Sequence, residues 1–127
     1  PKYQDNVYNV GPIPVKEGPS LYKECDAMFL PTLLECFSAN YPEAMAMELP
    51  ILTSDLDFAH SICHDAALFF NPTDPAQIAE NIIKIVESQP LREDLIKKGK
   101  QNLSCFPTPS QKAKAYLSII SHSISNS

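Results

Sequence analysis

The sequence lacks several features that would each indicate a particular class of protein. It contains no apolar run near the roughly 20 residues that a membrane-crossing helix needs. It has no basic excess, because 10 Lys and Arg residues stand against 15 Asp and Glu, which gives a formal net charge of −5. Non-specific nucleic-acid binding depends on Lys and Arg, so this balance disfavours nucleic acid as a partner. The first residues also lack the basic-then-apolar layout of a signal peptide, and we therefore expect a cytoplasmic protein.

The cysteines form no Cys-x-x-Cys pair, which disfavours a disulfide framework or a zinc knuckle and suits reduced thiols. They stand at wide, irregular spacings: Cys25, Cys36, Cys63 and Cys105.

The chain has 127 residues, of which 44% are hydrophobic. A chain of this length buries roughly two thirds of its unfolded surface. We therefore expect one globular domain at residues 1–120, followed by a flexible tail at residues 121–127.

Short apolar runs alternate with stretches of helix-forming residues. The run at residues 27–30 is apolar at every position, as expected of a strand that is covered on both faces in a parallel sheet. The alternation predicts an α/β fold with a parallel sheet and flanking helices. The expected strands are residues 7–10, 27–30, 51–53 and 68–70. The expected helices are residues 21–25, 41–48, 58–63 and 91–103, with one from Asp74 to Pro90 and one from Thr108 to the tail.

Three helix starts carry a capping signal. Asp74 and Thr108 are each followed by Pro and, three residues on, by Gln, which is a capping-box arrangement, and Asn40 is the expected N-cap of the helix at 41–48. In the helix after Asp74 the apolar residues recur at helical spacing. Its expected inward positions are Ile78, Ala79, Ile82, Ile83, Ile85 and Val86, and its expected outward positions are Glu80, Asn81, Lys84 and Glu87.

Ligands of open parallel sheets bind beyond the carboxyl ends of the strands, so the loop after residues 27–30 is the first place to look for a site. This loop and the following helix carry two carboxylates, Glu35 and Glu43. Carboxylates accept hydrogen bonds from hydroxyls, and a helix start offers backbone N–H groups to a phosphate. An alternative stays open for each residue: Glu43 would complete a capping box with Asn40, and Glu35 would be solvated.

Residues 35–46 and 49–55 closely resemble the donor-binding half of family-four retaining glycosyltransferases of GT-B fold. The hallmark of that family is two Glu residues separated by seven, here Glu35 and Glu43, in a context that includes Phe37 and Pro50. Residues 65–72 and 74–79 also resemble its C-terminal region, so the resemblance covers nearly the whole chain.

The resemblance implies a nucleotide-sugar site. Glu43 would bind the ribose hydroxyls, and Glu35 would be the catalytic residue, lying against the hydroxyls of the donor sugar without acting as a covalent nucleophile. Phe37 and Ser38 would offer backbone N–H groups to the sugar and diphosphate, and Cys36 would be a small residue near the sugar. The implied reaction transfers a hexosyl group with retention and uses neither a bound metal nor another cofactor.

The chain departs from the family pattern at three positions that usually hold glycine, and two segments of the family pattern do not occur in these 127 residues. Family members usually have Gly where this chain has Cys36, Ser38 and Glu48, and the last Gly normally allows a left-handed turn past the helix. The family's basic diphosphate-binding segment and its N-terminal acceptor-binding domain would precede Tyr8. The resemblance therefore implies only the C-terminal donor-binding part, without its first βα units, and no transferase activity of this chain alone.

Other interpretations stay open beside this one. A non-catalytic α/β module of the flavodoxin-like kind, with an interaction or regulatory role, would have the same pattern of elements. His60, Cys63 and His64 share one helix face, where they are either zinc ligands or a partly buried surface. The C-terminal third is locally basic and would either meet anionic lipid or a partner domain, giving peripheral membrane association, or be solvated. Its cations are Arg92, Lys97, Lys98, Lys100, Lys112 and Lys114.

Overall fold

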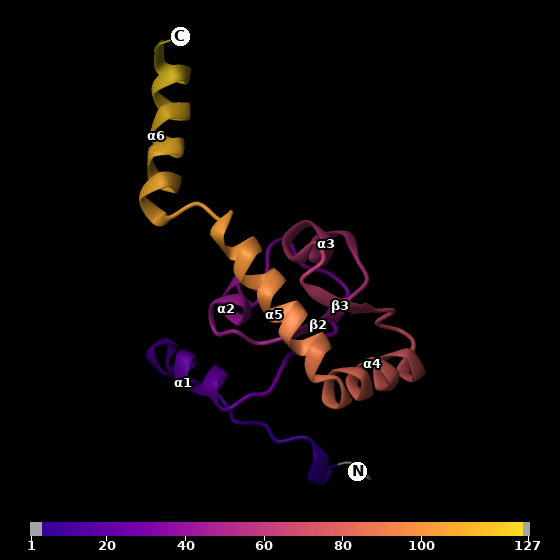
Figure 1. Cartoon of the computed structure of the whole chain (residues 1–127). Coiled ribbons are helices and arrows are strands. Elements are labelled where there is room, and N and C mark those ends of the chain that lie inside the picture. Colours follow the sequence, from indigo (N-terminus) through magenta and orange to yellow (C-terminus); the bar gives the residue numbers. More distant parts are fainter. Residues whose placement is uncertain (1–3, 126–127) are drawn as a thin grey trace.

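The computed structural model describes residues 4–125 and contains a three-stranded parallel sheet (Figure 1). The strands are β1 (Met28–Leu30), β2 (Ile51–Ser54) and β3 (Ala67–Phe70), and they lie side by side in this order. Met28 pairs with Ile51, which pairs in turn with Ala67. Helices connect and flank these strands, so the expected α/β class with a parallel sheet is confirmed.

The described part of the chain contains six α-helices and two short 3₁₀ turns. Each of the two sheet crossovers contains a short helix, as parallel neighbours require. The helices are α1 (Gly18–Lys23), α2 (Asn40–Ala46), α3 (Asp57–Cys63), α4 (Pro75–Glu87), α5 (Gln89–Ser104) and α6 (Pro109–Ser125), and the 3₁₀ turns are η1 (Gln4–Asn6) and η2 (Val15–Glu17).

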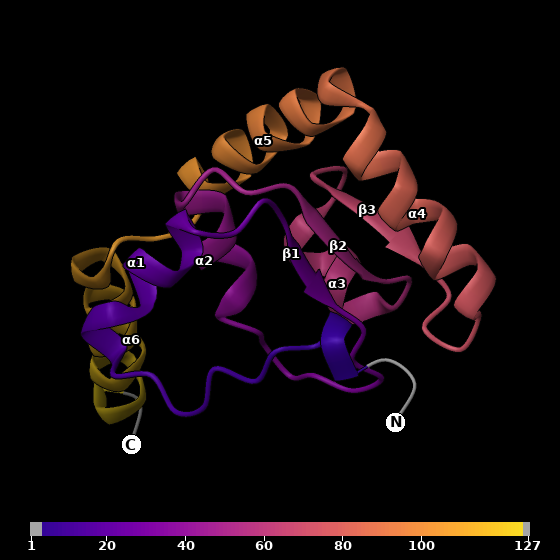
Figure 2. The ribbon, with the colours of Figure 1, turned by 90° about the horizontal axis from the view of Figure 1, so that it is seen from below.

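The core is divided by the sheet, because successive side chains of a strand point to opposite faces. On one face the strands pack against α2 and α3, and on the other they pack against α4 and the start of α5; α2 and α4 lie on opposite sides of the sheet in Figure 2. The first cluster includes Met28, Tyr41, Met45, Ile51 and Ile62, and the second is Leu52, Phe70, Ile85 and Leu95.

Helix α5 runs across α2, and the absence of a side chain at Gly99 allows the two helices to approach closely. A Cβ atom added at Gly99 would lie 3.2 Å from Cγ of Met45, closer than nine in ten real Cβ contacts. At its other end, α5 supports α4, because Arg92 Nη1 donates to the carbonyl oxygens of Ile85 (2.6 Å) and Val86 (2.8 Å). These carbonyls belong to the last turn of α4, where the C=O groups have no hydrogen-bond partner within the helix.

The predicted helix caps are confirmed in two cases and wrong in the third. Asp74 accepts from the backbone N–H of residues 76 and 77, and Thr108 and Gln111 bond each other reciprocally. Gln77, however, accepts from the N–H of Asn71 rather than completing a box with Asp74. Asn40 is not an N-cap: it is the first helical residue, and Ala39 precedes it without a side-chain cap.

The strand predicted at residues 7–10 is absent, and the described sheet has three strands rather than about four. Val7, Tyr8 and Val10 are all exposed. A strand requires a neighbour to pair its backbone N–H and C=O groups, and no described segment lies alongside these residues as a ladder partner. The β-branched and aromatic composition alone was therefore an insufficient basis for a strand.

The two faces of α4 also differ from the prediction. Asn81, expected to point outward, is buried and donates through Nδ2 to the carbonyl oxygen of Phe69 at 2.9 Å. Ile82, Ile83 and Val86, expected to be inward, are exposed. Ile82 and Val86 line an open cavity of about 520 Å³ that also reaches Phe29 in β1, so the sheet of the described residues does not fill the space beside this face of α4.

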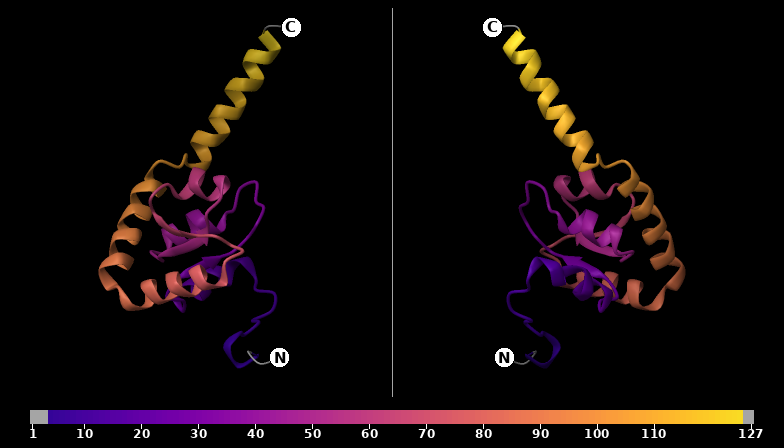
Figure 3. Two further views of the ribbon diagram at one scale, coloured as in Figure 1. Left: turned by 90° about the vertical axis from the view of Figure 1, so that its right-hand side faces the viewer. Right: turned by 90° about the vertical axis from the view of Figure 1, so that its left-hand side faces the viewer.

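Helix α6 extends away from the body of the molecule (Figure 3). Its apolar residues Tyr116, Leu117 and Ile120 are exposed. The helix continues to Ser125, past Ser121 where the sequence predicts a tail, and residues 126–127 lie outside the described part of the chain. The flexibility of that tail stays a prediction. No helix in residues 4–125 combines the length and the apolar character needed to span a bilayer.

Candidate functional site

The loops after the three strands begin at one edge of the sheet, because all the strands run in the same direction. β1 leads into the loop at residues 31–39, β2 into Asp55, and β3 into Asn71. The sequence-predicted candidates Glu35, Cys36, Phe37 and Ser38 all lie in the first of these loops. Glu43 follows in α2, and the structure therefore keeps the candidates on one loop and the helix it leads into.

Glu43 is exposed on α2 and accepts a hydrogen bond from the phenol of Tyr22 in α1, with 2.9 Å between Oη and Oε2. The capping-box alternative for this residue is wrong. Its side chain does not reach back to the helix start, because the helix begins at Asn40 and Glu43 lies one position too far along it. The carboxylate is therefore used for tertiary contact and not for a helix cap.

Glu43 and Tyr22 together line a cavity of about 460 Å³ between α1 and α2. The other lining residues are apolar or small: Val15, Gly18, Pro19, Ala46 and Met47. A mostly apolar cavity with few polar groups is typical of a site for a planar or hydrophobic ligand whose orientation is set by hydrogen bonds. A carboxylate on its wall adds a preference for hydroxyl donors.

The loop candidates differ in exposure. Glu35 is half-buried, Cys36 and Phe37 are exposed, and Ser38 is buried. Within residues 4–125, Glu35 forms no hydrogen bond or ion pair with another side chain, so its carboxylate is not used in a structural contact of the described chain. Burial raises the pKa of Tyr41 above its usual value, and the negative charge of Glu35 adds to that rise.

A buried pair of hydroxyls fixes α2 on the sheet. Tyr41 Oη lies 2.7 Å from Thr53 Oγ1, and Thr53 donates to the carbonyl oxygen of Leu30 at 3.1 Å. Because Thr53 has a single hydroxyl hydrogen, Tyr41 is the donor of the first bond. This chain of bonds joins α2, β2 and β1, and it holds both ends of the loop at residues 31–39 in place.

The structure adds residues that the sequence analysis missed. Tyr22 is one, since it stands 21 positions before Glu43 and no local pattern joins them. The others are Thr32 and Ser54, whose hydroxyl oxygens are buried at the ends of β1 and β2 without a hydrogen-bond partner among the described residues. Buried polar atoms are normally satisfied, so both oxygens are suited to hold water or a ligand at the carboxyl edge. Their place directly after apolar runs was a sequence signal that could have identified them.

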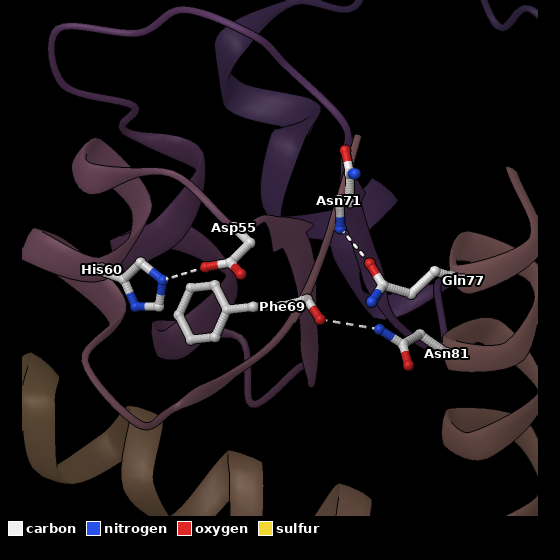
Figure 4. A network of polar contacts seen from close by, with 6 residues as sticks. All are labelled: Asp55, His60, Phe69, Asn71, Gln77 and Asn81. Carbon is white, nitrogen blue, oxygen red and sulfur yellow. Dashed lines mark hydrogen bonds and ion pairs between the residues drawn. The ribbon is translucent and has the colours of Figure 1, made fainter. Parts of the chain in front are cut away.

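A polar network ties α3 and α4 to the ends of β2 and β3 (Figure 4). His60 Nε2 lies 2.6 Å from Asp55 Oδ1, and the His60 ring stacks on Phe69 with 3.9 Å between the ring centroids. On the other side of β3, Gln77 bonds Asn71 and Asn81 bonds Phe69 (Figure 4). The network gives the carboxyl edge a fixed shape around Asp55 and Asn71.

One residue of the histidine and cysteine face belongs to this network. His60 is engaged with Asp55, and burial raises the pKa of the Cys63 thiol to about 12. His64 lies past the end of α3 at a positive φ of 48°. In the described part of the chain no three His, Cys, Asp or Glu side chains converge on a common point.

Several of the basic residues in the C-terminal third have local partners. Arg92 bonds the end of α4, Lys98 pairs with Asp94 at 2.6 Å, and Lys100 pairs with Glu48 at 2.8 Å. These contacts reduce the number of cations available to an anionic surface. Peripheral membrane association stays a prediction.

The fold is that of a GT-B glycosyltransferase domain, as comparison with solved structures shows. The solved structure of sucrose-phosphate synthase from Thermosynechococcus elongatus is similar to this chain, with a TM-score of 0.87 and 20% sequence identity. The likeness covers 99% of this chain and 32% of that one, so the chain spans about a third of the length of this relative. Comparison with curated proteins gave no match.

The family follows from the sequence itself. The sequence model of the family described as "Glycosyl transferases group 1" matches residues 2–102, which is most of the chain. The chain belongs to this family. The resemblance inferred from the Glu35 and Glu43 region is therefore confirmed at the level of glycosyltransferase family and fold. Assignment to family four and retention of configuration stay predictions.

Proposed function

We propose that this chain forms the donor-binding part of a retaining glycosyltransferase that transfers a hexosyl group from a nucleotide sugar, in carbohydrate biosynthesis. The observation that carries the proposal is the exposed carboxylate of Glu43 on the wall of the apolar cavity between α1 and α2. A nucleoside has a planar base and a ribose with two hydroxyls. The cavity walls suit the base, and Glu43 suits the hydroxyls.

The loop at residues 31–39 would hold the reacting half of the donor. Glu35 is half-buried and makes no hydrogen bond or ion pair within the described chain, so its carboxylate is available to the hydroxyls of the donor sugar. The backbone N–H groups of Phe37 and Ser38, next to Cys36, would bind the sugar and diphosphate. As the glycosidic bond to the nucleotide breaks, positive charge develops on the sugar and negative charge on the leaving phosphate. Fixed polar groups stabilise both charges, and we expect no metal or other cofactor.

Transfer also requires an acceptor site, which we place on an N-terminal acceptor-binding domain outside these 127 residues. We therefore propose that this chain alone binds the donor but does not transfer sugar. All four cysteines are free thiols, which supports a location in the cytoplasm.

Nuclear magnetic resonance of the chain tests the donor site. UDP, GDP and ADP sugars are titrated into the unsubstituted chain and into Glu43→Ala. We expect saturable shifts at residues 35–43 and in α1 for one of the three bases, and a loss of affinity of at least tenfold in Glu43→Ala, because the ribose hydroxyls lose a charged acceptor. The matched control is Glu87→Ala, which removes an exposed carboxylate at the far end of α4 and should bind like the unsubstituted chain.

The outcomes separate the proposal from its alternatives. If a well-folded sample shows no saturable shift with any donor, the chain has no donor site of its own and the non-catalytic α/β module becomes the better interpretation. If Glu43→Ala binds as tightly as Glu87→Ala, the ribose assignment is wrong. Retention is tested on the complete enzyme by the anomeric configuration of the first product formed, and inversion there would contradict the mechanism.

A further inference from the structure

We propose that Tyr22 is a positioning residue, which holds the Glu43 carboxylate in the orientation that accepts the ribose hydroxyls and so makes the site selective for ribose. This inference rests on the proposed donor site. Tyr22 and Glu43 come from different helices, α1 and α2, and both line the cavity between them. Their hydrogen bond is the one polar side-chain contact of Glu43 among the described residues.

The bond fixes one carboxylate oxygen and leaves the other available. Tyr22 donates to Oε2 at 2.9 Å, and Oε1 has no partner in the described chain. A carboxylate offers about four acceptor positions on its two oxygens, so the phenol occupies one of them and does not block the group. An exposed Glu otherwise loses rotamer freedom when it binds a ligand, and a carboxylate that is already held avoids part of that cost.

The phenol itself is held firmly. Its ring is half-buried and packs against the cluster that includes Tyr41 and Met45 of α2, so the hydroxyl keeps its place relative to that helix. Burial, and next the hydrogen bond to Glu43, raise the pKa of Tyr22 to about 12. The phenol therefore stays protonated and remains a donor at neutral pH. No Lys or Arg pairs with Glu43 in the described residues, so no cation of the described chain competes with a ligand for the carboxylate.

The test compares the affinity of the full chain for nucleotides that contain ribose and for nucleotides that contain 2′,3′-dideoxyribose. Nucleoside diphosphates of the preferred base, and their 2′,3′-dideoxy analogues, are titrated by calorimetry into the unsubstituted chain and into Tyr22→Phe, which keeps the ring and removes only the hydroxyl. We expect Tyr22→Phe to weaken binding of the ribonucleotide about fivefold and to leave the dideoxy analogue unchanged, because only the ribose contacts Glu43. In a Glu43→Ala background the Tyr22→Phe change should have no further effect.

Tyr116→Phe is the matched control, since Tyr116 lies on the exposed α6 and loses the same hydroxyl. Equal affinities of Tyr22→Phe and Tyr116→Phe for the ribonucleotide would overturn the inference while leaving the donor site intact. An equal loss for the ribonucleotide and its dideoxy analogue would also overturn it, because a structural defect lowers both. If the unsubstituted chain binds no nucleotide, the proposed function fails and this inference fails with it.

Discussion

Among single residues, Glu48 has a strained backbone conformation, which lowers stability, and a side-chain ion pair, which raises it. It follows α2 with a positive φ of 58°, in the left-handed region that favours glycine. The related family usually has Gly at this place, and the structure keeps the left-handed turn although the residue is Glu. An L-residue pays about 1–2 kcal/mol for this conformation. The carboxylate is meanwhile paired with Lys100 across to α5 at 2.8 Å, which offsets a part of that strain.

Replacing Glu48 by Gly should therefore stabilise the fold once the ion pair is removed. In a Lys100→Ala background we expect Glu48→Gly to raise the free energy of unfolding by about 1 kcal/mol, because the strain is relieved while glycine adds some unfolded-state entropy. Urea unfolding measures this difference. Glu48→Ala in the same background keeps a Cβ atom and should give no gain; equal values for the two variants would show that the turn is unstrained.

At the scale of elements, the close approach of α5 to α2 is decided by Gly99. A glycine in the middle of a helix costs about 0.5–1 kcal/mol relative to alanine, and only a packing requirement balances that cost. Here the requirement is visible, because Met45 lies where a Cβ would point. Since α2 carries Glu43 and borders the candidate loop, this contact also fixes the site.

We expect Gly99→Val to lower the free energy of unfolding by about 1–3 kcal/mol, as overpacking of a tight contact does. Thermal unfolding followed by circular dichroism measures the loss. Gly18→Val provides the comparison, since nothing lies within 4 Å of a Cβ added at Gly18 and its φ is not left-handed. A Gly99→Val protein as stable as Gly18→Val would mean that α5 is free to move off α2.

At the scale of the whole molecule, several acidic groups have a higher pKa in the folded state than in the unfolded state. Burial raises the pKa of Cys63 from 9.0 to about 12, and burial together with Glu43 raises that of Tyr22 from 10.0 to about 12. Above pH 9 the unfolded chain therefore binds fewer protons than the folded chain. Stability falls with rising pH wherever that is the case.

The free energy of unfolding should then be flat between pH 7 and 8.5 and decline from about pH 9 to pH 12. Urea unfolding at a series of pH values, with reductant present, gives the slope. Cys63→Ala removes the thiol and should make the decline begin about one pH unit later, where the tyrosines start to ionise in the unfolded chain. The same onset in both proteins would show that Cys63 is ionised as easily in the folded chain as in the unfolded one.

Local patterns were sufficient for much of the architecture. The apolar runs that became β1, β2 and β3 and the caps at Asp74 and Thr108 depend on residues close together in sequence, where periodicity and capping chemistry act directly. The spacing of Glu35 and Glu43 likewise identified the glycosyltransferase family, because the motif is contiguous. Where a pattern needed a distant partner, as at residues 7–10, the prediction was wrong.

The sequence by itself thus determined the α/β class, the three strands of the described sheet, the family and the loop that carries the candidate residues. Only the tertiary structure decided what those residues contact. Tyr22 bonds Glu43, Asn81 bonds Phe69, and Gly99 packs against Met45. The two residues of each pair are 12 to 54 positions apart in the chain. Such contacts depend on which helix faces pack together, and that is set by the shape and volume of the whole core rather than by any local spacing.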